Sequence, residues 1–359
     1  MHKKLFIPGP TEVGDDVLKA QARYMIGHRS QDFTDLYDSI LTQLRELFKT
    51  DQHILVVAAS GTIFMDITAR NLIRSGKKAL CCVNGSFSSR MYDAVVGSEK
   101  EADRLDVEWG KAVKPEMIKE KLEKSKYDVI TICYNETSTG VKAHLKEIAD
   151  VLKDYPETLL AVDAVSSMGG DLLYPEEMGT DLVFASSQKC FALPPGLAVG
   201  VVSQKALDRA NEVKGRGLYT DLVAILGYYE KKKQTPSTPA ISLLYAMDFQ
   251  LKKMLKEGAE GIYQRHKAMA DYTHKWALDR GFGLFAEEGY RSITVTTVVN
   301  TLGKDVGALN KALGEKGMIL ANGYGKLKDQ TFRIGHMGDH TVEDIKKLLN
   351  CIDEIWELK

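Results

Sequence analysis

The apolar positions of the chain follow one pattern through residue 203. Short apolar runs rich in β-branched residues alternate there with amphipathic stretches such as KPEMIKEKLEKS and HLKEIADVLKDY. The runs occupy residues 53–60, 78–84, 127–135, 158–164, 180–186 and 196–203. Continuous apolar strands suit a sheet that is covered on both faces, and their alternation with helices predicts a largely parallel α/β sheet.

The pattern changes after residue 243. A long charged helical stretch over about 243–280 precedes RSITVTTVVNT, in which apolar and polar residues alternate as in a half-exposed strand. A helix (DVGALNKALGEKG), a short strand (TFRIGHM) and a last amphipathic helix follow, and Thr341 and Asp344 predict a capping box at the start of that helix. We therefore expect a smaller α+β unit behind the large sheet.

Composition places few limits on function. A length of 359 residues predicts two domains, and 44% apolar residues with a formal net charge of −1 do not favour binding to nucleic acid or to a membrane surface. The apolar segment at the N-terminus is too short for a signal peptide, and no run is long enough to span a bilayer, so the expected location is the cytoplasm.

Cysteine and histidine give no metal signal. The five cysteines have no C-x-x-C spacing and lie mostly in or beside apolar runs, which predicts buried, reduced thiols. His336 and His340 are four residues apart, but Gly338 and Asp339 between them predict a turn, so the two rings are not expected to converge on a metal.

The strongest chemical signal is a lysine at the end of a predicted buried strand. In FASSQKCFALPPG, Lys189 follows an apolar run and precedes a loop stiffened by two prolines. A strand end followed by such a loop is a common place for catalytic residues, so Lys189 is a candidate reactive amine. An amine that must form an imine needs a carbonyl cofactor, and the neighbouring segments suit pyridoxal phosphate.

Two further segments could hold that cofactor. Asp163 closes an apolar strand, where it either pairs with the N–H of a pyridinium ring or caps the next turn through its own side chain. The turn ASGT offers backbone N–H groups at the start of a helix, the hydroxyls of Ser60 and Thr62, and a glycine, Gly61, that permits close approach of a phosphate.

Two polar turns complete the set. Phe87 in NGSFSSR follows a predicted strand and could stack on a planar ring or belong to the core. Thr137 in YNETSTG could bind a phenolic oxygen of the cofactor or stand in an ordinary polar turn. Each of these signals is weak alone, and their order along the chain is more informative.

Together, these segments resemble the class V aminotransferases. IPGPTEV, SGT, NGSFSSR, ETSTGV, VDAVSSMGG, SSQKCFALPPG and FRIGHMG occur in the order of that family, and the likeness is greatest to the branch that uses alanine or serine with glyoxylate or pyruvate. The resemblance implies an α/β pyridoxal-phosphate enzyme of fold type I, with a mostly parallel seven-stranded sheet. It also implies a homodimer with shared active sites.

The resemblance also implies a domain layout and a reaction. Residues 1–20 would form an N-terminal arm that lines the active site, 21–245 the large cofactor-binding domain and 246–359 the small domain. The implied activity is a ping-pong transfer of an amino group from alanine or serine to glyoxylate or pyruvate. Phosphoserine or aminoethylphosphonate transamination, a class V cysteine desulfurase or lyase, and a catalytically silent partner subunit remain as alternatives.

The cofactor site follows from the same resemblance. Lys189 is implied to form the internal aldimine with pyridoxal phosphate, Asp163 to pair with the ring nitrogen, and Phe87 to stack on the ring. The remaining cofactor-binding residues implied are Ser60, Gly61, Thr62, Thr137, Gln188, Thr235 and Thr238, the last from the second subunit.

Substrate contacts are implied for Arg333 and Gly9. Arg333 would clamp the substrate carboxylate, although an arginine on a strand more commonly forms a surface ion pair. Gly9 would line the entrance. The chain departs from the branch at three positions, with Phe87 in place of a frequent tryptophan, Thr137 in place of serine and Thr235 in place of tyrosine. These departures weaken any assignment of the substrate.

Overall fold

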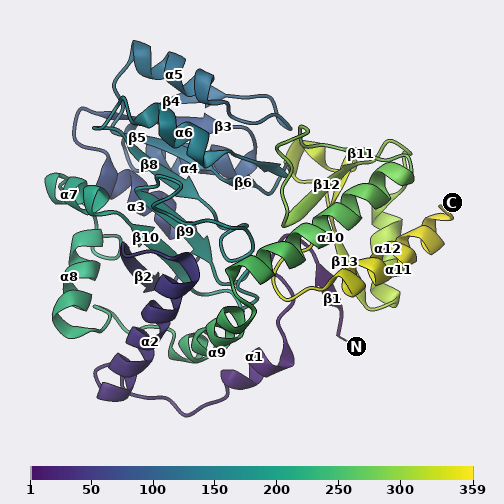
Figure 1. The fold of residues 1–359 in the computed structure, drawn as a ribbon, viewed down its shortest axis with the longest axis horizontal. Coiled ribbons are helices and arrows are strands. Elements are labelled where there is room, and N and C mark those ends of the chain that lie inside the picture. The colour runs from purple at the N-terminus through teal and green to yellow at the C-terminus, as the bar shows by residue number, and fades with distance from the viewer. Residues whose placement is uncertain (1, 359) are drawn as a thin grey trace.

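The computed structural model describes residues 2–358 and contains a seven-stranded and a five-stranded sheet that lie side by side (Figure 1). The large sheet has the spatial order β2 (His53–Val57), β10 (Ala198–Val202), β9 (Leu182–Ser186), β8 (Leu159–Asp163), β5 (Val129–Cys133), β3 (Lys78–Val83) and β4 (Glu101–Asp106). Within it, β10 runs antiparallel to both neighbours and the other pairs are parallel. This confirms the predicted sheet. The edge strand β4 was not predicted, because its sequence EADRLD is polar and largely solvent-accessible.

Alternate residues of the strands pack on the two faces of the large sheet. Leu160 and Val162 of β8 belong to one apolar cluster, and Leu159 and Ala161 to the other. The first cluster includes residues from α2 (Gln31–Phe48), α5 (Pro115–Lys124), α6 (Leu145–Leu152) and α9 (Ile241–Glu257). The second includes residues from α3 (Ile63–Leu72), α4 (Ser86–Gly97), α7 (Gln204–Glu212) and α8 (Leu222–Lys232). Burial on both faces explains why the strands are continuous apolar runs.

The small sheet recruits the N-terminus of the chain. Its order is β1 (Lys4–Phe6), β13 (Met318–Asn322), β14 (Thr331–Gly335), β12 (Val295–Val299) and β11 (Gly283–Leu284). Strand β1 pairs in parallel with β13, so the expected N-terminal arm begins with a strand of the small sheet. Residues from α10 (Ala259–Asp279), α11 (Val306–Glu315) and α12 (Val342–Trp356) pack with this sheet in a third apolar cluster.

One strand is more buried than its alternating pattern predicts. The expectation of a half-exposed strand at RSITVTTVVNT is wrong, because four of the five residues of β12 are buried. The strand lies between β14 and β11, and the neighbouring strands cover its two threonines, Thr296 and Thr297. Thr296 Oγ1 lies 2.8 Å from a ring nitrogen of the buried His336. The polar residues of this strand are therefore buried threonines rather than solvent-exposed positions.

The charged helical stretch divides into two helices at a glycine. Gly258, with φ of +79°, separates α9 from α10, and α9 packs on α2 while α10 packs on α12. The expected domain boundary at residues 245/246 falls within α9. The predicted capping box of α12 is confirmed, since Thr341 and Asp344 exchange both hydrogen bonds. Across residues 2–358 we find no helix with the length and apolar character needed to cross a membrane.

The remaining elements are short. They are α1 (Asp15–Ala20), the two-stranded pair β6 (Asn135–Glu136) and β7 (Val141–Lys142), and the 3-10 turn η1 (Gly325–Leu327). Strand β6 follows β5 at the carboxyl edge of the large sheet, and η1 lies between β13 and β14 of the small sheet. Asn135 of β6 and Tyr324, immediately before η1, line the cavity described next.

Candidate functional site

A cavity of about 280 Å³ lies where β5, β8 and β9 end. The carboxyl edge of a parallel sheet is the usual position of a ligand site in α/β proteins. Polar, apolar and charged side chains from both sheets line the cavity, and nine of them were predicted from the sequence. These nine are Gly9, Ser60, Gly61, Thr62, Phe87, Thr137, Asp163, Gln188 and Lys189. The fold therefore brings together residues that are up to 180 positions apart in the chain.

Lys189 lies three residues after the end of β9, on a turn that faces the cavity. Burial lowers the pKa of its amine to about 8, and the positive charges of Arg333 and Arg90 act in the same direction. The ammonium donates a hydrogen bond to the carbonyl of Pro8. A Cβ at position 9 would collide with the lysine side chain, so Gly9, at φ of +109°, lets the N-terminal segment cover it. At neutral pH this amine is much easier to deprotonate than an exposed lysine.

Asp163 is a buried carboxylate that lacks a cationic partner at hydrogen-bond distance among the described residues. The side chain is 4% exposed, and its Oδ1 accepts a hydrogen bond of 2.9 Å from the backbone N–H of Val165. Burial raises its pKa to about 7, against the effect of that hydrogen bond. The structure shows the capping contact of Asp163 with the next turn, whereas its pairing with a ring nitrogen stays a prediction, which the raised pKa favours because a charged N–H donor would stabilise the ionised form.

The start of α3 offers hydroxyls but fewer backbone donors than expected. Ser60 and Thr62 are exposed, and no hydrogen bond of residues 2–358 involves their hydroxyl groups. The N–H of Gly61, however, already donates to Ser186 Oγ at 2.7 Å. Nearby, Gln188 Oε1 is buried without a partner. This corner therefore has free hydroxyls at the positive end of a ten-residue helix, which suits an anion.

Phe87 lies in the first turn of α4 and meets two side chains that the sequence did not single out. The guanidinium of Arg90 lies over its ring, 5.0 Å from the centroid, and the ring of Tyr324 lies 5.4 Å away. All three residues line the cavity. Arg90 was present in the motif NGSFSSR, and its spacing of three residues from Phe87 on one helix could have indicated a shared face.

Arg333 and Thr137 meet at the side of the cavity. Arg333 on β14 is 8% exposed and donates hydrogen bonds to the carbonyls of Asn322 (3.1 Å) and Thr137 (3.3 Å). Burial lowers its pKa to about 10. The hydroxyl of Thr137 donates to Ser166 Oγ at 2.8 Å. Arg333 is not among the residues that line the cavity. Its guanidinium lies 5.2 Å from the ring of Tyr324, and Tyr324 does line the cavity.

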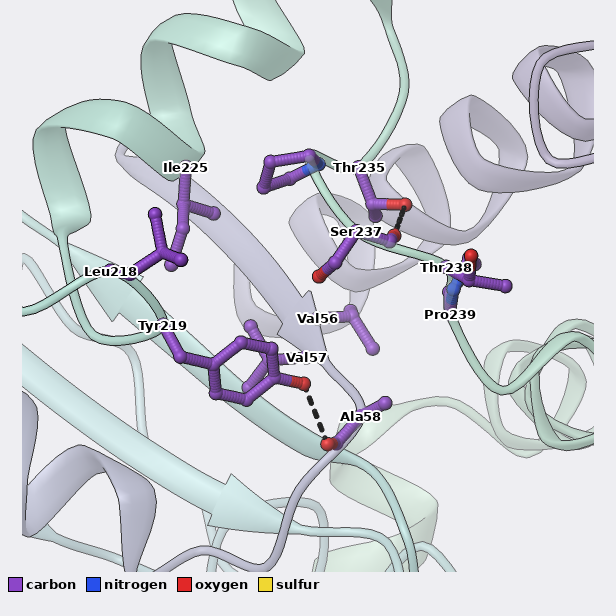
Figure 2. A pocket seen from close by; sticks show the side chains of 11 residues that line it. Val56, Val57, Ala58, Leu218, Tyr219, Ile225, Thr235, Ser237, Thr238 and Pro239 are labelled. Carbon is purple, nitrogen blue, oxygen red and sulfur yellow. Dashed lines mark hydrogen bonds between the residues drawn. The ribbon is translucent and has the colours of Figure 1, made fainter.

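Thr235 and Thr238 lie in a different hollow of the same chain. This hollow of about 200 Å³ is mostly apolar and lies between the end of β2, Tyr219 and the segment 235–239 (Figure 2). Thr235 Oγ1 is bound to the carbonyl of Ser237, and Arg29 holds the segment by donating to the carbonyl of Thr235 at 2.7 Å. The fold of one chain thus does not bring either threonine to the cavity with Lys189.

Cysteine chemistry has no support at this site. Cys133 and Cys190 lie beside Asp163 and Lys189, but both are buried, and burial raises their pKa values above the ordinary thiol range. Cys351 lies in α12 and packs against the third apolar cluster. Among residues 2–358, no group of three or more histidine, cysteine, aspartate or glutamate side chains is placed to hold a metal ion.

Comparison with known proteins agrees with this geometry. The sequence pattern of the family described as aminotransferase class-V matches residues 5–348. An uncharacterized aminotransferase of Methanocaldococcus jannaschii is 41% identical over 98% of this chain and 92% of its own length. A serine–glyoxylate aminotransferase of Methylorubrum extorquens is 32% identical over 93% of this chain and 86% of its own. The crystal structure of an alanine–glyoxylate aminotransferase from Nostoc sp. superimposes with a TM-score of 0.94 at 27% identity, covering 99% of this chain and 96% of that one.

Proposed function

The chain belongs to the class-V aminotransferases, and from this premise we propose that it moves the amino group of a small amino acid to a small 2-oxo acid by a ping-pong mechanism. The family uses pyridoxal phosphate, whose conjugated ring accepts electrons when a bond to the substrate α-carbon breaks. Glyoxylate or pyruvate is the proposed acceptor, and alanine or serine remains the donor predicted from the sequence. One observation carries the proposal: a lysine of lowered pKa and a buried aspartate of raised pKa share one cavity.

The residues present fit the cofactor. Asp163 lacks a charged N–H donor, and a protonated pyridine nitrogen supplies one. The free hydroxyls of Ser60 and Thr62 at the start of α3 suit the phosphate. The amide oxygen of Gln188, which has no hydrogen-bond partner, lies in the same cavity. The exposed part of the Phe87 ring suits a stacked heterocycle. These residues would hold the cofactor between α3 and α4.

Lys189 would act as both anchor and base. Its amine loses its proton near pH 8, so a useful fraction is nucleophilic under physiological conditions. Once a substrate has displaced it, the same nitrogen can accept the proton of the substrate α-carbon. The N-terminal segment at Pro8 and Gly9 covers this nitrogen and limits the access of water.

Arg333 would orient the substrate. Two of its N–H groups hold backbone carbonyls, and no ion pair among residues 2–358 engages its charge. An almost buried guanidinium without a counter-ion is suited to bind the carboxylate that every amino acid and 2-oxo acid carries. Fixing that carboxylate also fixes which bond of the α-carbon faces Lys189.

A second subunit is part of the proposal. The hollow that contains Thr235 and Thr238 is mostly apolar, and Leu218 at its edge is 97% exposed. An apolar side chain exposed to this extent beside an apolar hollow favours contact with another protein surface. We propose a homodimer in which these threonines reach the partner's cofactor.

The direct test is chemical labelling of the loaded protein. Borohydride reduction followed by peptide mapping should place the cofactor on the peptide that contains Lys189, and Lys189→Ala should lower turnover by at least about 100-fold. Lys205→Ala, which removes a partly exposed lysine of α7, serves as the control and should retain both the labelling of the Lys189 peptide and the turnover of the wild type. Labelling of another lysine, or full turnover by Lys189→Ala, would refute the proposal.

A further inference from the structure

Two arginines approach the same tyrosine beside the cavity. Arg90 Nη2 lies 3.5 Å from the hydroxyl of Tyr324, and the Arg333 guanidinium lies 5.2 Å from the Tyr324 ring. No ion pair within residues 2–358 includes either arginine. Tyr324 comes from the segment between β13 and β14 and Arg90 from α4, so the pair joins the small sheet to the large one. The site thus holds two guanidinium groups without counter-ions.

The nearby carboxylates do not neutralise Arg90. Glu136 is fully buried and accepts hydrogen bonds from the backbone of Phe87 and Ser88 and from the hydroxyls of Ser88 and Ser138. Asp163 is needed for the cofactor ring nitrogen under the proposed function. Both carboxylates are therefore engaged elsewhere, and the positive charge of Arg90 stays available to the cavity.

The charge of an ordinary substrate does not account for this second cation. Alanine, glyoxylate and pyruvate each carry one carboxylate, for which Arg333 suffices. The proposed phosphate site belongs to Ser60 and Thr62 at the start of α3, whereas Arg90 lies on α4. An amino acid with an acidic side chain brings one more negative group.

The contacts of Arg90 leave its edge free for such a group. Its guanidinium face lies over the Phe87 ring, and a single N–H approaches the Tyr324 hydroxyl. Stacking uses the face of the guanidinium, so N–H groups at its edge remain for a carboxylate or phosphate, which they can bind in a bidentate manner. Phe87 and Tyr324 therefore orient the Arg90 guanidinium and leave N–H groups free to bind an anion.

We propose that Arg90, oriented by Phe87 and Tyr324, binds an anionic group on the substrate side chain, so that the preferred amino donor is an acidic amino acid. This rests on the proposed aminotransferase function, and it replaces alanine or serine, the donor predicted from the sequence, with an acidic amino acid. The shared chemistry is an anionic oxygen, which aspartate and glutamate present as a carboxylate and O-phosphoserine as a phosphate.

The first experiment compares donors in the holoenzyme. We measure kcat/KM for alanine, aspartate, glutamate and O-phosphoserine with one acceptor, pyruvate. The wild type should prefer an acidic donor, and Arg90→Gln should lower the ratio of acidic donor to alanine by about 10- to 100-fold, as the loss of one charge-assisted contact predicts. The acidic donor whose kcat/KM falls most in Arg90→Gln shows whether Arg90 binds a side-chain carboxylate or a phosphate. Arg90→Lys should retain part of the ratio, because the charge remains without the fork.

A matched control is available on β4, beside the same helix. Arg104 stacks over Tyr92 of α4 at 4.8 Å, as Arg90 stacks over Phe87, but it is paired with Asp106 outside the cavity. Arg104→Gln removes the same charge and the same type of stacking, and it should leave every donor ratio unchanged. Tyr324→Phe keeps the ring and loses the hydroxyl, and should reduce the acidic preference by about 2- to 10-fold.

A second readout does not depend on turnover. Succinate, a dicarboxylate without an amino group, is titrated into the holoenzyme by calorimetry, with acetate as the monocarboxylate probe. Arg90→Gln should raise the succinate dissociation constant by at least about 10-fold and leave that of acetate unchanged. Equal loss for all donors with weaker cofactor retention would assign Arg90 to the cofactor and overturn the inference. An unchanged donor ratio with active enzyme would also overturn it, while leaving the aminotransferase function intact.

Discussion

Burial shifts both Asp163 and Lys189 toward their neutral forms. Removing a group from water disfavours its charged form, which raises the pKa of the Asp163 carboxyl to about 7 and lowers that of the Lys189 amine to about 8. A cofactor that brings a pyridinium nitrogen would restore the charge of Asp163. A cofactor aldehyde would react with the neutral amine of Lys189. The cavity without its cofactor therefore carries an electrostatic cost that loading relieves.

The first prediction concerns Asp163→Asn. The folded-state pKa of Asp163 lies above its unfolded value of 3.8, so the wild type loses stability as pH rises from about 4 to 7, where the buried group ionises. The neutral amide avoids this cost. The cofactor-free variant should therefore match the cofactor-free wild type near pH 4 and have a higher Tm than the wild type at pH 8.5.

The same variant should bind the cofactor less well. Loss of the ion pair with the ring nitrogen should weaken binding by about 10- to 100-fold, measured by the absorbance of the loaded protein. Asp150→Asn, at an exposed site of α6, is the control and should change neither quantity. A variant that binds the cofactor like the wild type would exclude Asp163 as the partner of the ring.

The second prediction concerns the pH dependence of cofactor uptake. Only the neutral amine of Lys189 is nucleophilic, so the rate constant for loading the cofactor-free protein should rise with pH and level off above about 8. Stopped-flow absorbance at several pH values measures this rate. A midpoint above 10, as for an exposed lysine, would contradict the lowered pKa.

At the scale of elements, one buried glutamate holds the start of a helix that faces the cavity. Glu136 in β6 accepts the backbone N–H groups of Phe87 and Ser88 in the first turn of α4, at 3.1 and 2.8 Å. It thus satisfies donors that the helix itself leaves free, and its negative charge suits the positive end of the helix. Phe87 and Arg90 are positioned through this contact.

The third prediction follows from that arrangement. Glu136→Gln keeps the shape but loses the charge and places an amide nitrogen where one oxygen now accepts hydrogen bonds. The free energy of unfolding should fall by about 1–3 kcal/mol, because buried donors lose a charged partner. Denaturant unfolding measures this, with Glu120→Gln at an exposed position of α5 as the control, expected within about 0.5 kcal/mol. Equal stability of the two variants would show that α4 does not depend on Glu136.

At the scale of the molecule, the site is assembled from both ends of the chain. Strand β1 pairs with β13, and the segment that follows β1 places Gly9 next to Lys189. The segment between β13 and β14 brings Tyr324 to Phe87. Figure 1 shows β1 and the C-terminal helices on the same side of the large sheet. Segments joined to the small sheet therefore form one side of the cavity.

The fourth prediction concerns assembly. If the hollow beside Leu218 is the subunit contact, Leu218→Asp should shift the protein from dimer to monomer and lower cofactor retention, because Thr238 would no longer reach the partner's site. Light scattering coupled to size exclusion measures the mass. Leu278→Asp, at an exposed position of α10, is the control and should remain dimeric. A monomeric wild type would refute the arrangement.

The sequence by itself determined the features that depend on local pattern. Apolar runs predicted the strands of the large sheet except β4, and the turns at their ends identified seven residues of one cavity. Such signals are readable because strand burial and turn chemistry act over a few residues. The local pattern also suggested pyridoxal phosphate and a reactive amine at Lys189, and the family resemblance added Gly9 and Gln188 to the predicted site.

Only the tertiary structure decided which distant residues meet and which groups lose their contact with water. The approach of Tyr324 to Arg90 joins positions 234 residues apart, and the burial of β12 depends on the strands beside it. The shifted pKa values of Asp163 and Lys189 likewise arise from surrounding protein rather than from their neighbours in sequence. Periodicity reports one element at a time, whereas burial and charge pairing are properties of packed elements.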